Sequence, residues 1–593
     1  MTKPHRHRVT FAGQNREAES GEAESLLAVA RRAGVRLLAS CGGRGTCGAC
    51  RVKIVLGEVH GGAEDDGWHK ACRSHARSDL VVEPAPRSMA APERADVDSR
   101  DADIAPDPLI HAHDLALEPA TVEDPRDDAR RLLDALAGRA EILDLEAART
   151  LSGLLRDQDW QIRAFRRGPT VIAVAPRHTR PLGLAVDLGT TNIAGYLVDL
   201  ETGARVAARG LENPQTFFGA DVVSRITHAV REPEGGPELR RVAGEGLAVL
   251  ARELCAHAGV SETAILDAVI GGNTAMQHLL LGLPVKQLGH APFVPALSDA
   301  VDVPAAEVGL ALAPGARVHL FANVGGFVGG DHVAMLLAIE KRMGQGATLA
   351  LDIGTNTEIS LIDGPEIVSI SCPSGPALEG GHIMCGMRAA NGAIERVWVE
   401  ENGTIGFATI GNQPAVGLCG SGILDAVAAF AKAGLIEPGG RIQPHHPQVV
   451  ERRHKKAIRL EGEVVVTQDD IRAVQLAKAA IRAGIDHLLK AAGRTEGDLA
   501  RIIVAGAFGA YIDIESAVAI GLLPDILRAR IVQVGNAAGL GARMALVSGA
   551  ARARAGVLAR RCRYLELAGQ PDFQTTYLAR LRLDPNTARK EPT

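Results

Sequence analysis

Two short stretches, far apart in the chain, are nearly identical, and this repetition limits the possible folds more than any other feature. "LAVDLGT" occupies residues 184–190 and "LALDIGT" occupies 349–355, and each continues into a second apolar run that ends in an aspartate, Asp199 or Asp363. Each copy has the pattern of a buried strand, a tight glycine turn and a second strand. Two copies predict a duplicated fold, and the strands and helices that alternate from residue 181 onward indicate the α/β class.

The polar residues of these turns indicate a phosphate site. Asp187 and Asp352 follow apolar runs, so each carboxylate emerges at a strand end beside a glycine that lets the backbone approach a ligand. Hydroxyl and N–H groups of such turns can surround phosphate oxygens, while the aspartates hold hydrated Mg²⁺. A single Asp-Gly turn needs no ligand to explain it, because it also joins the two strands of a hairpin. Two such turns in the same context favour the phosphate interpretation.

A third segment supports a nucleotide site. "RIIVAGAFGAYID", residues 501–513, is a buried strand that opens into a turn with Gly506 and Gly509, where a nucleoside can lie against the backbone. A tight strand-to-helix turn explains these glycines equally well. Together with the paired turns, the segment resembles the actin/Hsp70/sugar-kinase (ASKHA) superfamily, in which two duplicated α/β subdomains hold ATP between them. That resemblance implies the fold and the nucleotide but not the reaction.

The first hundred residues carry a different chemistry. In "CGGRGTCGAC", residues 41–50, Cys41, Cys47 and Cys50 have the spacing C-x5-C-x2-C, and Cys72 follows. Four thiolates can hold a [2Fe-2S] cluster, and the glycines let backbone N–H groups point at its sulfurs. Four cysteines also satisfy a structural zinc site. The glycine density and the strand pattern "RVKIVLGEV" directly after the loop favour the cluster, although the loop is one residue longer than the plant-type spacing. The remaining cysteines lack ligand spacing and are interpreted as ordinary thiols: Cys255, Cys372, Cys385, Cys419 and Cys562.

Shifts in composition divide the chain into four parts. Residues 1–83 have the pattern of a small α+β unit of the β-grasp ferredoxin type, and residues 84–108, rich in Pro, Ala and Asp, are a linker. Residues 109–180 carry one clear helix pattern, "DDARRLLDALAG", and a β-run, "TVIAVAP", which predict a small middle domain without chemistry of its own. Residues 181–593 form the duplicated ATPase. The predicted fold class is therefore multidomain α/β.

Composition excludes several other classes of protein. A net charge of -5 and a pI near 6.5 give no bias toward nucleic acid or membrane surfaces. No run reaches the roughly 18 apolar residues of a membrane span, and the start "MTKPHRHRVTFAG" lacks the apolar core of a signal peptide. Nine cysteines in so long a chain do not suggest a disulfide framework, so we expect a cytoplasmic protein.

Over nearly its whole length the chain resembles the reductive activators of corrinoid-dependent methyltransferases, the RACo and RamA-like family. Its members join an N-terminal [2Fe-2S] domain, a linker and a middle domain to a C-terminal ASKHA ATPase. Besides the cysteine loop and the paired turns, the resemblance rests on these motifs: "ENPQTFFGADVVSRI" (212–226), "GGNTAMQHLLLG" (271–282), "GGFVGGD" (325–331), "SGPALEGGHIMCGMRAANGAI" (374–394), "GLCGSGILDAVA" (417–428) and "VAGAFG".

The resemblance implies an ATP-hydrolysing reductive activase. Such an enzyme returns the Co(II) of a corrinoid protein to Co(I) with an electron from its [2Fe-2S] cluster, in a methyltransferase or demethylase system. It implies a corrinoid (cobalamin-binding) protein as partner and an upstream electron donor, and it leaves a homodimer open. The family's motifs match the cluster ligands Cys41, Cys47, Cys50 and Cys72, the phosphate and Mg²⁺ turns Asp187, Gly189, Thr190, Thr191, Asp352, Gly354, Thr355 and Asn356, and the nucleoside turn Gly506 and Gly509.

One further residue is a candidate for the corrinoid side of the reaction. "CGSG", residues 419–422, is a short polar turn ahead of an apolar helix, and we expect Ser421 to be exposed there and to face the corrinoid. A serine that caps the N-terminus of the helix "GILDAVAAFAKAG" explains the turn equally well.

Three other functions fit part of the sequence. A small-molecule kinase with an appended ferredoxin domain needs a phosphoryl acceptor and a base near the γ-phosphate. An iron–sulfur, ATP-binding redox sensor binds a partner without multiple turnovers of electron delivery. The ATPase that activates 2-hydroxyacyl-CoA dehydratases holds a [4Fe-4S] cluster between two subunits, and the N-terminal cysteine loop is evidence against that class.

Overall fold

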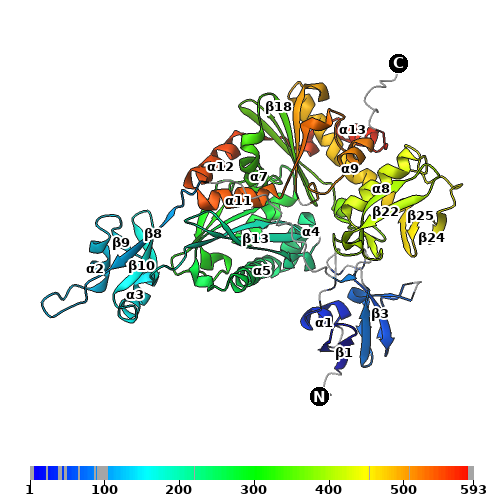
Figure 1. Cartoon of the computed structure of the whole chain (residues 1–593). Helices are drawn as coiled ribbons and strands as arrows, with labels where there is room; N and C mark the ends of the chain where they lie inside the picture. The colour runs from blue at the N-terminus through cyan, green and yellow to red at the C-terminus, as the bar shows by residue number, and fades with distance from the viewer. Residues whose placement is uncertain are drawn as a thin grey trace.

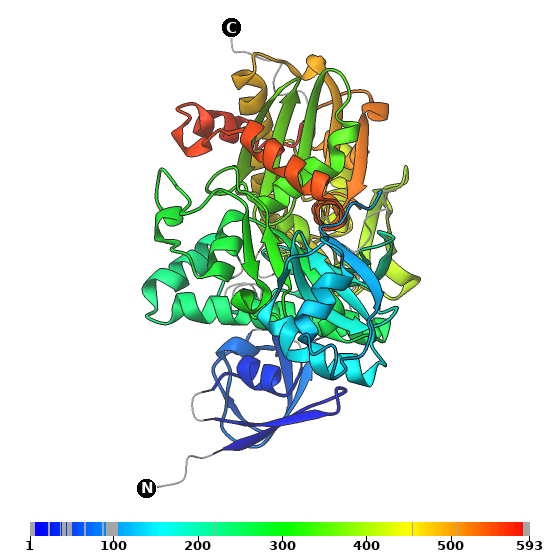
Figure 2. The same cartoon turned by 90° about the vertical axis from the view of Figure 1, so that its left-hand side faces the viewer.

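The computed structural model describes residues 6–21, 24–35, 37, 43, 45, 50–64, 67–85, 88–89, 105–219, 221–452, 455–506 and 508–584. Figure 1 shows an N-terminal domain (blue), a small domain (residues 105–181, cyan) and an ATPase domain of two halves (residues 182–342 and 347–584). Figure 2 agrees that the N-terminal domain lies at one end of the molecule and the second half at the other, with the first half between them. The predicted multidomain α/β class is confirmed.

The N-terminal domain is a mixed sheet with one helix across it. Its strand order is β2-β1-β7-β3-β5, in which β1 pairs parallel with β7 and the other neighbours are antiparallel. The helix begins after Ser25, whose hydroxyl accepts a hydrogen bond from Ala28, and it buries four apolar residues against the sheet. This is the β-grasp arrangement. The elements are β1 (His7–Phe11), β2 (Arg16–Ser20), α1 (Leu26–Arg32), β3 (Arg51–Leu56), β4 (Val59–His60), β5 (His69–Lys70), β6 (His75–Ala76) and β7 (Leu80–Pro84).

The small domain is a four-stranded sheet, ordered β8-β10-β11-β9, with two helices. The predicted helix and β-run correspond to α2 and β11, whereas the second helix, α3, was not predicted. Part of this domain, including Phe165 and Ile172, is buried in the same hydrophobic core as the first half of the ATPase domain. The elements are β8 (Ile110–Ala116), α2 (Asp128–Ala135), β9 (Ile142–Leu143), α3 (Leu145–Asp157), β10 (Gln161–Arg167) and β11 (Thr170–Pro176).

The two halves of the ATPase domain repeat one topology, as the echo in the sequence predicts. In the first half the sheet runs β14-β13-β12-β15-β17, and in the second it runs β20-β19-β18-β27-β28. Each begins with an antiparallel meander and adds two parallel strands beside the central one. The strands are β12 (Leu182–Leu188), β13 (Asn192–Asp199), β14 (Arg205–Glu212), β15 (Ile265–Gly272), β16 (Val301–Pro304), β17 (Arg317–Leu320), β18 (Ala347–Ile353), β19 (Thr357–Asp363), β20 (Glu366–Cys372), β27 (Leu499–Ala505), β28 (Ile531–Gly535) and β29 (Cys562–Tyr564).

Helices cover both sheets. In the first half these are α4 (Val222–Arg231), α5 (Gly235–Ala258), α6 (Thr274–Leu281) and α7 (Gly330–Ile339). The second half contributes α8 (Gly420–Lys432), α9 (Gln468–Ala491), α10 (Ile514–Ala519), α11 (Ala537–Val547), α12 (Gly549–Arg561) and α13 (Phe573–Ala579). It also carries two small sheets, made of β21 (Ala393–Val399), β22 (Ile405–Thr409) and β23 (Gly417–Leu418), and of β24 (Val449–Arg452), β25 (Lys455–Glu461) and β26 (Val464–Thr467). None of the helices among the described residues is both long and apolar enough to span a membrane.

Candidate functional site

The paired turns meet in one cleft between the two halves of the ATPase domain. Its volume is ≈ 130 Å³. This is smaller than the roughly 300–1,000 Å³ of typical small-molecule sites. The predicted residues that line it are Asp187, Gly189, Thr190, Thr191, Asp352, Gly354, Thr355, Asn356 and Gly506. Two other predicted residues, Gly509 and Ser421, do not line the cleft.

Glycine is needed where the backbone of these turns approaches other chain segments. A Cβ at Gly189 would lie 2.6 Å from the carbonyl oxygen of Asn192. At Gly506, which has φ +89°, a Cβ would lie 2.7 Å from a carboxylate oxygen of Asp352. The third segment therefore touches the second turn directly, as expected for the wall of one shared site.

A cluster of buried acids forms the floor of the cleft. Burial raises the pKa of Asp187 to about 6. A hydrogen bond that Asn536 donates at 2.9 Å lowers the same pKa and offsets part of this rise. Burial and the nearby Asp187 raise the pKa of Asp331, in the first turn of α7, to about 7. Burial and these two carboxylates raise the pKa of Asp352 to about 8. Burial and the charges of Asp331 and Asp352 also raise the pKa of Glu358, on β19. So much negative charge in one place favours a cation as its partner.

A glutamate joins the two phosphate turns. The hydroxyls of Thr191 and Thr355, one from each half, lie 2.9 Å apart. Each also donates to the carboxylate of Glu379, at 3.3 Å and 2.9 Å. Burial raises the pKa of Glu379. These hydrogen bonds and the charge of Arg388 lower it and offset part of the rise. The hydroxyls that would hold phosphate oxygens are thus engaged by a carboxylate between the two halves.

Several residues of the cleft were not predicted from the sequence. Asn273 donates to the Thr190 hydroxyl at 2.9 Å, and Asn536 holds Asp187 as described. Asp331 follows two glycines and precedes an apolar helix, and Glu358 is a charge inside a buried run, which are the signals that could have found them. The polar residues of the cleft that sequence reasoning missed are Asn192, Asn273, Asp331, Glu358, Glu379 and Asn536.

The expected exposure of Ser421 is wrong. Only 7% of the residue is exposed, because the N-terminus of α8 packs tightly on neighbouring backbone. A Cβ at Gly420 would lie 1.8 Å from the carbonyl oxygen of Leu378, and one at Gly422 would lie 2.0 Å from that of Ile394. The capping alternative is wrong as well, since the N-cap residue is Cys419 and Ser421 lies inside the helix, 3.3 Å from the Cys419 sulfur.

The cysteine site is described in part. Cys41 and Cys47 lie outside the described residues. Cys50 and Cys72 are buried in the core of the N-terminal domain, and the Ala71 N–H donates to the Cys50 carbonyl at 2.8 Å, which brings the two segments together. The loop also reaches Cys72, because a Cβ at Gly43 would lie 3.9 Å from the Cβ of Cys72. Two of the four predicted ligands therefore lie on adjoining segments beside the glycine loop.

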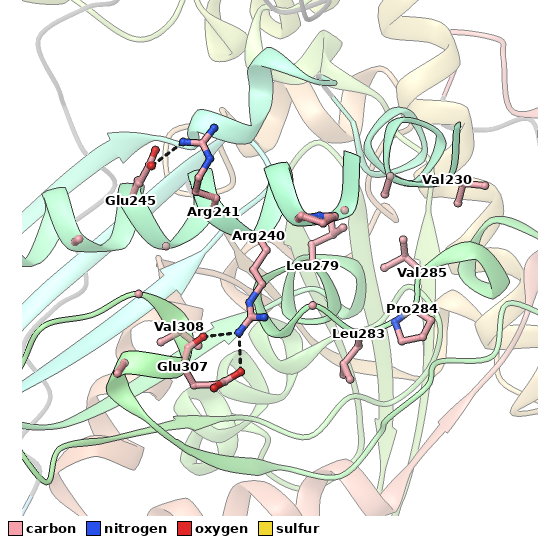
Figure 3. A pocket seen from close by; sticks show the side chains of 18 of the residues that line it. Val230, Arg240, Arg241, Glu245, Leu279, Leu283, Pro284, Val285, Glu307 and Val308 are labelled. Atoms are coloured by element: carbon pink, nitrogen blue, oxygen red, sulfur yellow. Dashed lines mark hydrogen bonds and ion pairs between the residues drawn. The ribbon is translucent and has the colours of Figure 1, made fainter. Parts of the chain in front are cut away.

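A larger cavity, of ≈ 850 Å³, opens between α5, α6 and the loop that contains Glu307. Figure 3 shows that Arg240 and Arg241, which border it, point to Glu307 and Glu245 and pair with them. The lining also includes Lys286, and the rest is mostly apolar or small. We assign it no reaction.

Comparisons with known proteins cover nearly the whole chain. A family model for a 2Fe-2S iron–sulfur cluster binding domain matches residues 9–77. Models of the RACo linker region, the RACo middle region and the C-terminal ASKHA domain of RACo match residues 99–181, 182–343 and 346–593.

The corrinoid activation enzyme RamQ of Eubacterium limosum is 32% identical over 96% of this chain and 98% of its own length. The [Co(II) methylated amine-specific corrinoid protein] reductase of Methanosarcina barkeri is 26% identical over 60% of this chain and 68% of its own. A solved structure, a reductive activator for corrinoid, iron–sulfur protein, is 32% identical, with a TM-score of 0.75 over 98% of this chain and 99% of that one.

Proposed function

Because the chain belongs to the RACo family of reductive activators, we propose that it returns the Co(II) of a corrinoid protein to Co(I) at the expense of ATP. The electron comes from its [2Fe-2S] cluster, and the reaction serves a methyltransferase or demethylase system. The observation that carries the proposal is the presence, in one chain, of a 2Fe-2S binding domain and a cleft of paired phosphate turns. Neither a plain ferredoxin nor a plain kinase needs both.

Four cysteines are proposed as the ligands of the cluster. The placement of Cys50 and Cys72 beside the glycine loop supports this, and thiolates are the ligands that iron–sulfur clusters prefer. When bound, the cluster supplies one electron at a time. Of the described ligands, Cys50 directly precedes β3 and Cys72 lies in the short helix Ala71–Arg73. The proposed set is Cys41, Cys47, Cys50 and Cys72.

We propose that the paired turns hold ATP with Mg²⁺. No three His, Cys, Asp or Glu side chains in the described part of the chain are placed to hold a metal ion by themselves. Mg²⁺ normally keeps several waters, so the buried acids suit a hydrated ion that also contacts phosphate. Asp187 and Asp352 are the proposed principal partners, with Asp331 and Glu358 adding charge nearby. When bound, Mg²⁺ neutralises phosphate charge.

The remaining predicted residues of the cleft surround the nucleotide. Gly189, Thr190 and Thr191 contribute one phosphate turn, and Gly354, Thr355 and Asn356 contribute the other. The nucleoside side consists of the Gly506 turn, which Gly509 shapes through its close packing on Ala505.

ATP supplies energy of the right size for this reduction. For one electron each ~59 mV corresponds to about 1.4 kcal/mol, so a gap of a few hundred millivolts costs several kcal/mol. Hydrolysis of ATP covers such a cost. We propose that it acts by changing the complex with the corrinoid protein, from a cleft that lies in a different domain from the cysteines.

The remaining parts of the proposal rest on the sequence. We propose a cytoplasmic protein that receives electrons from an upstream donor and whose partner is a corrinoid protein, with a homodimer left open. We keep the division into residues 1–83, 84–108, 109–180 and 181–593. Ser421 stays a candidate for the corrinoid side, acting from the buried start of α8. If Ser421→Ala leaves ATP-dependent Co(II) reduction unaltered, that role is removed.

The test is a reduction assay. Anaerobically reconstituted and reduced protein is mixed with a Co(II) corrinoid protein of a methyltransferase system, and Co(I) is followed in the visible spectrum with and without Mg-ATP. We expect Co(I) only with ATP, and its loss in Cys47→Ser and in Asp352→Ala. Absence of Co(I) with several candidate partners, despite an intact cluster and measurable ATP binding, would favour the redox sensor instead. Production of ADP that depends on a small-molecule acceptor would favour the kinase.

A further inference from the structure

The segment 212–226, one of the motifs without an assigned role, is fastened to the first phosphate turn. Asn213 is fully buried, and its side-chain amide donates to the Gly189 carbonyl at 2.8 Å while its backbone N–H donates to the Thr191 carbonyl at 2.9 Å. Its side-chain oxygen also accepts from Gln215 and caps the short helix Pro214–Phe217. One residue thus joins the turn to this helix.

A buried arginine makes a second connection between the same two parts. Arg225 is fully buried and donates to the carbonyls of Thr190 and Gly219. It also donates to the side chain of Gln215 at 3.2 Å. Because a buried arginine needs its donors satisfied, the turn and the short helix are held in a fixed relation.

The short helix ends at Phe217, which is 38% exposed, and the N-terminal domain docks there. The guanidinium of Arg31 lies over the Phe217 ring at 4.0 Å from its centre, a cation–π contact. Arg31 is in the last turn of α1, and Figure 1 shows this helix in the part of the N-terminal domain that lies below α4. The pKa of Arg31 is lowered by burial and raised in turn by the charges of Glu212 and Cys50. The charge of Arg31 therefore interacts with groups of both domains, Cys50 in its own domain and Glu212 in the ATPase domain.

A line of alternating charges runs from this contact to the bridge in the cleft. Glu212 is the last residue of β14 and accepts from Arg388 at 3.1 Å. Arg388 in turn acts on Glu379, which engages Thr191 and Thr355. A phosphate bound at the two threonines would compete with Glu379 for their hydroxyls, and a shift of Glu379 would change the charge near Arg388, the partner of Glu212.

We propose that the segment 212–226 is a docking platform for the [2Fe-2S] domain, and that nucleotide at the first phosphate turn strengthens docking through Asn213, Arg225 and Glu212. The inference deepens the proposed function, on which it rests, by adding its regulation. A turn that phosphate holds rigid also holds the Pro214–Phe217 helix rigid. Docking of α1 on this helix then loses less conformational entropy. Coupling of this kind is reciprocal, and docking must strengthen nucleotide binding by the same factor.

Because the coupling is reciprocal, substitutions at the docking contact, far from the cleft, should change the affinity for nucleotide. The affinity of the reconstituted full chain for Mg-AMPPNP is measured by calorimetry. We expect Arg31→Ala, and independently Phe217→Ala, to weaken binding by about two- to fivefold, the range that loss of one exposed cation–π contact permits. Phe217→Trp keeps a ring for Arg31, and we expect it to retain or exceed the wild-type affinity.

The matched control is Arg32→Ala. Arg32 neighbours Arg31 but pairs with Glu24 inside its own domain, so the affinity should not change. Wild-type affinity in both Arg31→Ala and Phe217→Ala would overturn the coupling and leave the ATP-dependent function standing, and so would an equal loss in Arg32→Ala. Failure of the wild-type chain to bind Mg-AMPPNP at all would overturn the ATP-dependent function itself.

Discussion

The small domain has a core of its own and also contributes residues to the core of the first half of the ATPase domain, whereas no described residue of the N-terminal domain belongs to that core. Ile110, Phe165 and Ile172 of the small domain are buried together with residues of β12, β13 and β15. The core around the cysteines contains residues of the N-terminal domain and Met89 that follows it. The same chain therefore carries one domain that is built into the ATPase and one that lies against it.

The charged contacts of the small domain and of the N-terminal domain differ in the same way: the small domain has a buried network, and the contact of Arg31 in the N-terminal domain is partly exposed. In the small domain Arg167 donates to Asp267 at 3.1 Å, and Asp267, 1% exposed, also accepts from Arg552 at 2.6 Å. This joins the small domain to β15 and α12 inside the protein. At the N-terminal domain, Arg31 and Phe217 meet at a partly exposed surface. A buried network fixes a domain in place, whereas a partly exposed contact such as that of Arg31 with Phe217 allows a domain to dock and leave.

The largest effect should come from breaking the buried network. Asp267→Asn removes the buried charge that Arg167 and Arg552 share and leaves them the more exposed Asp302. Loss of one member of a buried ion pair typically costs about 3–5 kcal/mol. We expect a clearly lower melting temperature of the full chain. Glu201→Gln is the control, because Glu201 is 45% exposed where it pairs with Arg163 of the small domain. Equal melting temperatures of the two variants would contradict a buried anchor.

The second prediction concerns how the stability of the folded chain depends on pH through Asp352 in the cleft. Asp352 has a pKa raised to about 8, so above about pH 4, the unfolded value, the folded chain holds more protons than the unfolded one. Stability without metal therefore falls as pH rises toward 8, by up to roughly 2.7 kcal/mol between pH 6 and 8 for one carboxyl. Thermal unfolding in EDTA should show this decline, and Asp352→Asn should flatten it.

Asp363→Asn is the control for this experiment, since Asp363 ends the same hairpin but pairs with Arg494 outside the cleft. The decline should persist in it. A decline as steep in Asp352→Asn as in the wild type would show that Asp352 is not its source.

The smallest of these effects should come from Asn213, which links the docking platform to the phosphate turn. Asn213→Ala removes a helix cap and the amide bound to the Gly189 carbonyl, at a cost of about 1–2 kcal/mol. We expect a modest loss of stability together with weaker Mg-AMPPNP binding. Asn273→Ala removes a cleft contact and the N-cap of α6 but no hydrogen bond to the described residues of the platform itself, so it should weaken nucleotide binding more than docking of the N-terminal domain.

Much of this architecture could be predicted from the sequence, because it depends on short motifs and on the local spacing of apolar residues. The repeated strand-turn-strand pattern predicts the duplicated sheets, and the glycines at 189 and 506 predict close backbone contact around the cleft. The helix at 128–135 and the strand at 170–176 follow from local periodicity. These features depend on neighbours in sequence or on an exact repeat.

What could not be predicted depends on contacts between distant segments. Glu379 joins the two turns only because the halves fold together, and Asp331 reaches the acids from the start of α7. Ser421 was expected at the surface because its turn is polar, but the packing of α8 against Leu378 and Ile394 buries it. The contact of Arg31 with Phe217 spans two domains and has no signal in local sequence.

The most direct test of this account compares the two attached domains in one experiment. Hydrogen exchange of the reconstituted full chain is measured by mass spectrometry with and without Mg-AMPPNP. The account predicts slower exchange in the phosphate turns and in Leu26–Arg32 of the N-terminal domain, and no change in Gln161–Arg167 of the small domain. Protection of the turns without any change in Leu26–Arg32, or an equal change in Gln161–Arg167, would contradict it.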